Sequence, residues 1–462
     1  MSNVAAVLLA AGESSRFGSP KQLALWNGRP LILHAAGLPW SAGLDPTIVV
    51  LGASADRIAP HLEGLPLTVV RNYRWREGLG SSLHVGLAAL PPRTEAVLFL
   101  TVDQPFVTVA HLHKLLSAWE QGAPIAATCW QGNFTVPAVF SRRYFEELAT
   151  LGGDVGGRML FAAHRKEVVA VQAPSALMVA DIDTPDEYER LLARRPQRDL
   201  RAVRAVLCDM DGVLWHGNRP LPGLHAFFEH LRREAIPFTL VTNNASKTPR
   251  QYVEKLARFG IEVEEAEVLN SALAAASYLK ETAPAGAEVY PVGGEGVHAA
   301  LREAGFKLVG EEAPRADYVV VGWDPALTWR KMARATLLIR KGATFIGTNP
   351  DRTFPAEEGQ VPGNGAQLAM LEAATDRKPI VVGKPSPELY RQALARMERR
   401  PEETLVIGDR LDTDILGGVR LGALTAMVLS GVHGEAELRR SLVSPDFVFR
   451  DLAALVEAWR SL

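Results

Sequence analysis

The chain has 462 residues, of which 47% are hydrophobic and 22% are charged, and its formal net charge at pH 7 is -2. This length exceeds what one hydrophobic core usually serves, so we expect at least two domains. The near balance of charge argues against nucleic-acid binding and against a polybasic membrane anchor, and it favours small-molecule partners.

The two cysteines, Cys129 and Cys208, lie in apolar runs without a Cys or His neighbour at metal-ligand spacing. We expect both to be buried and unpaired, as in a reducing compartment. The first residues, MSNVAAVLLAAGESS, carry no basic segment before their short apolar run, and no apolar stretch reaches the roughly 18 residues of a membrane span. The sequence therefore predicts a cytoplasmic protein that does not contact a membrane.

Short apolar runs alternate with helical patterns along the whole chain, for example AAVLLAAG, TIVVLGAS and AVLFLTVD, and later AVLCDMDG, FTLVTNN, PIVVGKP and TLVIGDR. This alternation predicts an α/β fold with mainly parallel sheets. The stretch LLARRPQRDLRAV is basic, contains a proline and separates two such series. We therefore predict two Rossmann-like domains, at residues 1–196 and 203–462, joined by a linker at 197–202.

A glycine-containing loop follows the first predicted strand, in LLAAGESSRFGSPK. Small residues around Gly12 let backbone N–H groups approach phosphate oxygens, while Arg16 and Lys21 supply the cations that a triphosphate needs. The loop matches neither a Walker A motif nor a Gly-x-Gly-x-x-Gly fingerprint. It indicates a nucleotide site, although such a loop alone is also compatible with an ordinary turn.

Acidic residues follow two further apolar runs of the first half, Asp103 in AVLFLTVDQPFV and Asp181 with Asp183 in MVADIDTPDEY. Open α/β sheets bind ligands at the carboxyl ends of their strands, and an ionised carboxylate there needs a partner such as a divalent cation. Asp103 could instead cap a helix, and Asp183 or Thr184 could cap the helix that begins near Pro185. Asp181 has no such alternative role, so we prefer it as the second metal ligand.

Over about residues 4 to 193 the chain resembles the MobA-like nucleotidyltransferases, specifically the molybdenum cofactor cytidylyltransferases. The motifs LAAGESSRFGSPKQL, RWREGLGSSLHVGL, VDQPFV, FTVPAVF, LGGDVGGRML and DIDTPDEY carry the resemblance in family order. It implies transfer of a nucleoside monophosphate from CTP or another NTP to a phosphorylated acceptor, with Mg²⁺ held by Asp103, Asp181 and Asp183. The segment Ala10-Ala11-Gly12 resembles the cytidine-type loop.

The same resemblance suggests that Ser81 and Ser82 contact the base or the ribose, although Ser81 could equally cap a helix. It places the acceptor near FTVPAVF and GGDVGGR, where Asp154 and Arg158 lie. A sugar or polyol phosphate remains an alternative acceptor to molybdopterin, because the triphosphate machinery would be the same.

The second half opens with AVLCDMDGVLW, which puts Asp209 at the tip of a strand and Asp211 two residues on. A carboxylate can attack phosphorus, and a second one can protonate the leaving oxygen and later activate water. Asp-Gly alone would also suit a turn. Further polar residues follow later apolar runs, and we expect them to converge on one carboxyl edge of one sheet: Thr242, Asn243, Lys384, Asp409 and Asp414.

From about residue 203 to 460 this set resembles the haloacid dehalogenase superfamily, in its NagD-like and 4-nitrophenylphosphatase-like branch. The resemblance implies that Asp209 is the nucleophile and Asp211 the general acid and base. Thr242, with its neighbour Asn243, and Lys384 would hold the phosphate. The implied Mg²⁺ ligands are Asp209, the Asp211 carbonyl, Asp409 and, in support, Asp414.

The stretch between Ala245 and Gly383 is far too long for a loop and carries alternating elements of its own. It predicts an inserted α/β cap domain within about 265–355, as in the NagD-like branch. The resemblance suggests that four loop residues border the substrate entrance, although ordinary loop chemistry explains them almost as well: Asp324, Asn349, Asp351 and Asn364.

We therefore predict a bifunctional Mg²⁺-dependent enzyme, a CTP-type nucleotidyltransferase fused to a phosphomonoesterase that works through an aspartyl-phosphate. Its partners would be the nucleotide, a phosphorylated acceptor and a phosphate monoester; the oligomeric state stays open. An alternative of another class is that one half is a non-catalytic nucleotide-binding or scaffolding module. The complete set of charged residues in both halves argues against it.

Overall fold

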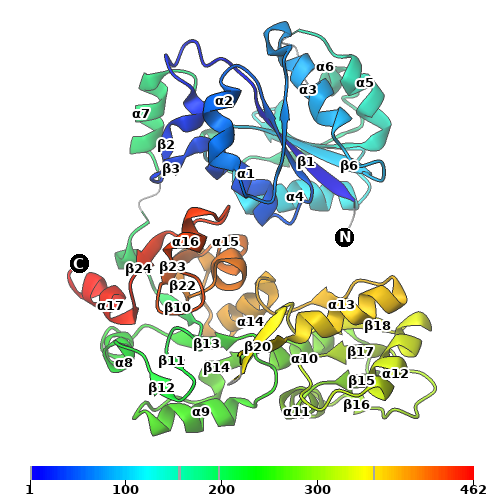
Figure 1. Cartoon of the computed structure of the whole chain (residues 1–462), viewed down its shortest axis with the longest axis vertical. Coiled ribbons are helices and arrows are strands. Elements are labelled where there is room, and N and C mark those ends of the chain that lie inside the picture. The colour runs from blue at the N-terminus through cyan, green and yellow to red at the C-terminus, as the bar shows by residue number, and fades with distance from the viewer. Residues whose placement is uncertain (1–2, 154–157, 196–197, 357–358) are drawn as a thin grey trace. The chain divides into compact units, whose positions relative to one another are not determined.

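The computed structural model describes residues 3–153, 158–195, 198–356 and 359–462 (Figure 1). The chain forms two compact units, Met1–Gln197 with Arg439–Ser444, and Arg198–Leu438 with Pro445–Leu462. Both units are α/β with mainly parallel sheets, which confirms the predicted fold class. None of the described helices combines the length and the apolar character needed to span a bilayer.

The first unit is built on a seven-stranded sheet in the order β5-β4-β1-β6-β8-β7-β9. Among its strands only β8 runs antiparallel to its neighbours. Every residue of β1 is buried, as expected for a parallel strand covered on both faces. The strands are β1 (Val4–Ala10), β4 (Thr47–Leu51), β5 (Thr68–Arg71), β6 (Ala96–Thr101), β7 (Ile125–Trp130), β8 (Asn133–Ser141) and β9 (Val168–Gln172).

Helices cover both faces of this sheet (Figure 1). On one face, Val7 and Leu9 of β1 belong to an apolar cluster with Leu83 of α3 and Leu148 of α5. The alternation of these two β1 residues follows from the two-residue period of a strand. The smaller elements of this unit are β2 (Leu25–Trp26), β3 (Arg29–Pro30), α1 (Leu31–Ser41), α2 (Ala55–Ile58), α3 (Leu79–Ala88), α4 (Val109–Glu120), α5 (Phe145–Thr150), α6 (Arg158–Ala163) and α7 (Pro185–Ala193).

The second unit contains a six-stranded sheet, which we call the core sheet, with all strands parallel in the order β14-β13-β10-β22-β23-β24. Its strands are β10 (Ala205–Cys208), β13 (Phe238–Thr242), β14 (Val268–Asn270), β22 (Thr404–Gly408), β23 (Leu424–Val428) and β24 (Phe447–Phe449). Around it lie β11 (Trp215–His216), β12 (Arg219–Pro220), α8 (Leu224–Arg233), α9 (Pro249–Arg258), α10 (Ser271–Thr282), α14 (Pro387–Met397), α15 (Leu416–Leu421), α16 (Glu435–Arg439) and α17 (Leu452–Arg460).

A second, five-stranded parallel sheet is inserted in the chain between β14 and β22, in the order β16-β15-β17-β18-β21. It runs from Glu288 to Val381, later than the predicted range of 265–355, because β14 pairs with β13 in the core sheet. Its elements are β15 (Glu288–Val292), α11 (Glu295–Glu303), β16 (Lys307–Leu308), β17 (Tyr318–Val321), α12 (Trp329–Arg340), β18 (Thr344–Gly347), β19 (Thr353–Ala356), β20 (Gly359–Pro362), α13 (Asn364–Thr375) and β21 (Ile380–Val381).

A buried histidine in α4 should make the first unit sensitive to acid. The His111 side chain is 3% exposed, and its Nε2 lies 2.9 Å from Thr128 Oγ1, which itself donates to Pro137 O. Nε2 must therefore carry a proton and donate it to Thr128 Oγ1. Burial, with a smaller effect of Lys114, lowers the pKa of His111 to about 4.

Between pH ~6.5 and ~4, His111 is protonated in the unfolded chain but not in the folded chain. The free energy of unfolding is therefore highest above this range and decreases as the pH is lowered through it. The loss at the acid end should be about 3 kcal/mol. Urea unfolding of the wild type and His111→Gln at pH 7.5, 5.5 and 4 measures it: the variant should have the shallower pH dependence. Equal slopes would contradict this assignment.

Candidate active sites

The loop after β1 is held in shape by a buried glutamine. The amide of Gln22 donates to Ala10 O at 3.0 Å and to Gly12 O at 3.1 Å, and Ser14 Oγ donates to Gln22 Oε1 at 3.3 Å. Ser14 itself adopts a positive φ of 58°. Gln22 thus fixes the backbone predicted to face phosphate. Sequence reasoning did not single it out, since nothing local marks a glutamine as buried.

Lys21 lies at the centre of the acidic groups of the first unit. Its Nζ donates to Asp103 Oδ2 at 2.7 Å, to Ile182 O at 2.8 Å and to Asp183 Oδ1 at 3.1 Å. Burial alone would lower the pKa of Lys21, but the charge of Asp103 and the bonds to both carboxylates outweigh it and raise this pKa. Arg16 adds a second cation, 2.9 Å from Asp183 Oδ2.

The two acidic segments are fastened side by side, since Ile182 N donates to Asp103 O at 2.9 Å. Asp181 and Asp183 follow a 3-10 turn at Ala176–Val179 and not a strand tip, so the sequence-based placement of these residues at the end of a strand was wrong. Thr184 is the cap of α7, in a capping box with Glu187, which leaves the Asp183 carboxylate to face Lys21.

The carboxyl group of Asp181 has a raised pKa. Loss of surrounding water, and then the charge of Asp103, raise its pKa to about 6, although the residue as a whole is exposed. Carboxylate oxygens are the ligands that Mg²⁺ and Ca²⁺ prefer. In this structure Asp103 and Asp183 bond Lys21, and the ligand oxygens of Asp103, Asp181 and Asp183 are not all within 4.8 Å of one another, so the predicted three-carboxylate metal site of this unit stays a prediction.

Ser81 and Ser82 are organised by one buried residue, Asn72, whose amide donates to the two hydroxyl oxygens at 2.8 and 3.0 Å. Gly78, and not Ser81, is the cap residue of α3. Ser81 borders a cavity of about 370 Å³, whereas Ser82 is buried behind it. Asp154 and the side chain of Arg158, expected near the acceptor, lie outside the described residues.

In the second unit, three neighbouring strands of the core sheet deliver polar residues at their carboxyl ends. Asp209 follows β10, Thr242 ends β13 and Asp409 follows β22. Lys384 does not come from this edge, because the preceding strand β21 pairs with β18 in the inserted sheet. The expectation that all these residues follow strands of one sheet was therefore wrong for Lys384, which follows the last strand of the inserted sheet.

Lys384 nonetheless lies between the carboxylates. Its Nζ is 2.5 Å from Asp209 Oδ1 and 2.6 Å from Asp414 Oδ1, and its side chain is 3% exposed. Burial would lower the pKa of Lys384, but Asp209 and Asp414 raise it well above its ordinary value. Burial raises the pKa of Asp209, and the charges of Asp414 and Asp409 raise it further. Lys384 lowers this pKa but does not offset the increase.

Asp209, Asp409 and Asp414 lie close enough together to bind one metal ion. Within the described part of the chain they are the group of three carboxylates whose ligand oxygens all lie within 4.8 Å of one another. Asp409 Oδ1 is buried without a hydrogen-bond partner, while Oδ2 accepts from Val432 N at 2.6 Å. Burial and the charge of Asp414 raise the pKa of Asp409 to about 7. An orphaned oxygen among clustered carboxylates fits a hard divalent cation.

Asp211 is held by a buried tryptophan. Its Oδ1 accepts from Trp215 Nε1 at 2.7 Å, and Trp215 is fully buried, whereas Asp211 itself is exposed. The indole therefore fixes one carboxylate oxygen of a residue that can still reach solvent and a ligand. Trp215 was not predicted as a site residue, because its role depends on the turn that brings it back onto Asp211.

Asn243 links the core sheet to the insertion. Its amide donates to Asp351 Oδ1 and to Lys384 O, both at 3.0 Å, and its carbonyl accepts from Asn349 Nδ2 at 2.6 Å. Asn364 Nδ2 in turn donates to Asn349 O at 2.7 Å. Three of the four predicted cap-loop residues thus position Asn243 and Lys384. The fourth, Asp324, instead pairs with Lys331 at 2.7 Å.

These sites define a two-domain enzyme, and comparison with known proteins identifies its parts. A model described as MobA-like NTP transferase domain matches residues 6–168. Haloacid dehalogenase-like hydrolase and HAD-hydrolase-like models match residues 206–307 and 381–455. The chain belongs to the haloacid dehalogenase-like hydrolases and carries a MobA-like nucleotidyltransferase domain ahead of the hydrolase part, as predicted; it is both a nucleotidyltransferase and a phosphatase.

The hydrolase part has well-described relatives. An acid sugar phosphatase of Staphylococcus aureus is 40% identical over 253 residues, which cover 55% of this chain and 96% of that protein. NagD of E. coli K-12 is 35% identical, with a TM-score of 0.51 over 54% of this chain and 97% of its own. A glycerol phosphate phosphatase of Mycobacterium tuberculosis, solved in complex with magnesium, is 34% identical, with a TM-score of 0.52 over 55% and 77%. Enzymes of both families generally use a divalent metal.

The close packing of glycine against Asp409 predicts a sensitive position. A Cβ at Gly431 would lie 1.9 Å from Asp409 Oδ2, whereas one at Gly434 would lie 3.5 Å from the nearest atom, Glu437 Oε2. Gly431→Ala should therefore displace the Asp409 carboxylate and weaken divalent-metal activation of the phosphatase by about 10- to 100-fold. Metal titration of activity measures this, with Gly434→Ala as the control; equal activation constants would contradict it.

Proposed function

We propose that the second unit is a Mg²⁺-dependent phosphomonoesterase in which Asp209 attacks the phosphorus of a phosphate monoester. The single observation that carries the proposal is the buried group of Asp209, Asp409 and Asp414 around Lys384. Mg²⁺, held by Asp209, Asp409, the Asp211 carbonyl and Asp414 in support, would neutralise phosphate charge and align the phosphorus with the nucleophile.

The chain's own residues would carry out two steps. An Asp209 carboxylate oxygen forms a bond to phosphorus while the bond from phosphorus to the alkoxide oxygen breaks, and Asp211 gives its proton to that oxygen. Water then attacks the phosphorus of the aspartyl-phosphate and passes a proton to Asp211, which releases phosphate and restores the Asp209 carboxylate. Lys384 and Thr242 would hold the phosphate oxygens, and Asn243 would position the Lys384 backbone.

The substrate class that we propose is a small sugar or polyol phosphate. Support comes from the names of the relatives, an acid sugar phosphatase and a glycerol phosphate phosphatase. We propose that the sheet from Glu288 to Val381 forms the cap of residues 203–462. Its contacts with Asn243 support this, because a cap must be tied to the loop that it covers.

For the first unit, within residues 1–196, we propose transfer of a nucleoside monophosphate from CTP to a phosphorylated pterin of the molybdopterin type. The resemblance of the Ala10-Ala11-Gly12 loop to the cytidine type supports CTP. Mg²⁺ on Asp103, Asp181 and Asp183 would neutralise the triphosphate, while Arg16 and Lys21 bind its oxygens. The acceptor oxygen forms a bond to the α-phosphorus as the bond to pyrophosphate breaks.

A second candidate acceptor is a sugar or polyol phosphate, and the acid sugar phosphatase relative of the second unit favours it. Product analysis with CTP or GTP and each acceptor class distinguishes the two. We also propose a reducing, cytoplasmic setting with small-molecule partners, which the two buried free cysteines support.

Replacing the proposed nucleophile tests the phosphatase. Asp209→Asn should lower kcat for a sugar phosphate roughly 10³-fold or more, because an amide cannot form the covalent intermediate. Nucleotidyl transfer by the same variant should be unchanged, which shows that the substitution leaves the first unit intact. Phosphatase activity at the wild-type level would refute the assignment of Asp209.

The converse test removes the ammonium group of Lys21 in the first unit. Lys21→Met keeps the apolar stem but leaves Asp103 and Asp183 without their lysine, and it should reduce nucleotidyl transfer by about 10²- to 10³-fold. Pyrophosphate release from CTP measures this, while hydrolysis of a sugar phosphate should not change. The surface substitution Arg57→Ala is the control. Nucleotidyl transfer equal in all three proteins would contradict the role of Lys21.

A further inference from the structure

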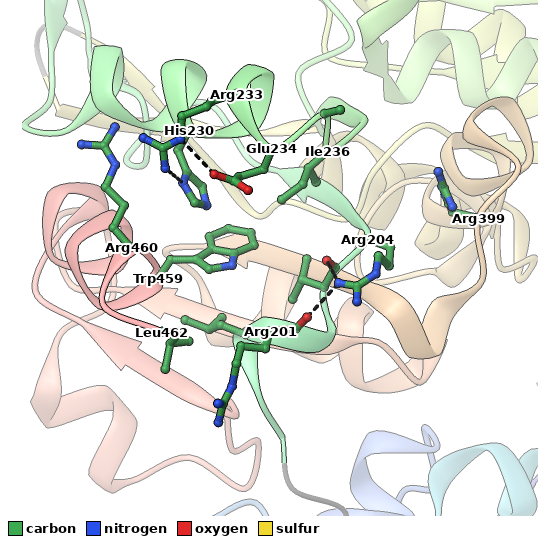
Figure 2. A pocket seen from close by; sticks show the side chains of 13 residues that line it. Arg201, Arg204, His230, Arg233, Glu234, Ile236, Arg399, Trp459, Arg460 and Leu462 are labelled. Atoms are coloured by element: carbon green, nitrogen blue, oxygen red, sulfur yellow. Dashed lines mark hydrogen bonds and ion pairs between the residues drawn. The ribbon is translucent and has the colours of Figure 1, made fainter.

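The second unit contains a cavity of about 440 Å³ that none of the proposed chemistry uses (Figure 2). It lies at the amino edge of the core sheet, since Arg204 immediately precedes β10, Ile236 lies just before β13 and Arg399 lies ahead of β22. Asp209 lies at the opposite end of β10, five residues or about 16 Å along an extended chain. The cavity is therefore separate from the phosphatase site.

The lining of this cavity is strongly basic. Five arginines and one carboxylate, Glu234, border it; in Figure 2 the Arg201 side chain points away from the space between His230, Trp459 and Ile236. Three of the arginines are ion-paired: Arg201 with Asp199 at 2.7 Å, Arg233 with Glu234 at 2.9 Å and Arg460 with Glu229 at 3.8 Å. Arg204 and Arg399 have no ion-pair partner among the described residues, and Arg204 donates only to backbone carbonyls of Arg201 and Val203. The five arginines are Arg201, Arg204, Arg233, Arg399 and Arg460.

A buried histidine supplies an independent observation. His230 is 3% exposed and borders the cavity, and its Nε2 is buried without a hydrogen-bond partner. Arg233 NH2 donates to His230 Nδ1 at 3.2 Å, so Nδ1 accepts. Burial and the charge of Arg233 lower the pKa of His230, which keeps the ring neutral with its proton on Nε2. The orphaned group is thus an N–H donor, and Figure 2 shows the ring directed into the cavity above Trp459.

Helix ends explain only part of this pattern. Arg233 and Arg460 lie in the last turns of α8 and α17, where a cation complements the helix dipole. Arg204 belongs to no α-helix, and the dipole argument does not account for a buried donor that lacks an acceptor. Arginine side chains and an N–H group together present only donors, which an anion with several acceptor oxygens would satisfy.

We infer that this cavity binds a small diphosphate-bearing anion. Its volume lies in the range of small-molecule sites and exceeds the need of a single phosphate. Arg204 and Arg399 would bind the phosphate oxygens, His230 Nε2 would donate to one of them, and Trp459 and Ile236 form the apolar side. The shared chemistry is a diphosphate, which free pyrophosphate and a nucleoside diphosphate both carry.

Calorimetric titration of the full chain tests the inference, with EDTA present to suppress metal-dependent binding at the other two sites. The probes are pyrophosphate, CDP and, as the weaker ligand, inorganic phosphate. The double variant Arg204→Ala/Arg399→Ala should raise the Kd of this binding event at least tenfold. His230→Phe, which keeps an aromatic ring beside Trp459, should raise it severalfold. Tighter binding of CDP than of pyrophosphate would identify a nucleotide site, and the reverse order a pyrophosphate site.

The matched control is Arg258→Ala/Arg377→Ala, which removes two exposed arginines outside the cavity and changes the net charge equally. It should bind the diphosphates as the wild type does. Phosphatase activity equal to the wild type in every variant reports correct folding. Wild-type affinity and stoichiometry in both the arginine and the histidine variants, or no diphosphate binding by the wild type, would overturn the inference.

Discussion

One buried ammonium group holds the phosphatase site together. Lys384 Nζ contacts both Asp209 and Asp414, and Asp409 lies within the same group of carboxylates. Three carboxylates from which water is largely excluded cannot all stay ionised without compensating charge. Lys384 supplies one positive charge. Asp409 Oδ1 has no hydrogen-bond partner and could bind a cation from solution, which would supply more. The ends of β10 and β22 place Asp209 and Asp409 next to each other, and Lys384 offsets part of their negative charge.

The first unit also places several carboxylates close together, but these side chains are more exposed to solvent. Lys21 bonds Asp103 and Asp183, while Arg16 bonds Asp183 from the exposed side. Here the compensation is incomplete, since Asp181 keeps a pKa of about 6.

The sequence was informative where a buried parallel strand ended in an acidic residue, but not for Asp181 and Asp183, which follow a 3-10 turn. A buried parallel strand is apolar throughout, so Asp209 and Asp409 stand out at its end, and so does Asp103. The α/β class followed from the same runs. Residues such as Gln22 and Trp215 were missed because each acts through a hydrogen bond that only the folded loop creates.

The extent of the inserted sheet and the origin of Lys384 were misjudged for a related reason. Strands β14 and β21 have similar apolar character, yet the first belongs to the core sheet and the second to the insertion. Pairing partners are chosen over long stretches of chain, and a short apolar run does not reveal them. The contacts of Asn243 with Asp351 and Lys384, 108 and 141 residues away, are equally invisible locally.

The position of Lys384, after the inserted sheet, also determines when the residues of each site become available during translation. The groups around Lys21 are complete once Asp183 has been made, whereas Asp209 must wait for a lysine 175 residues later and then for Asp409 and Asp414. Because domains fold as units from the N-terminus during synthesis, the nascent chain acquires its nucleotidyl-transferring pocket first. The residues of the hydrolytic pocket are all present only when translation is nearly finished, and the first unit also receives Arg439–Ser444 only at that stage.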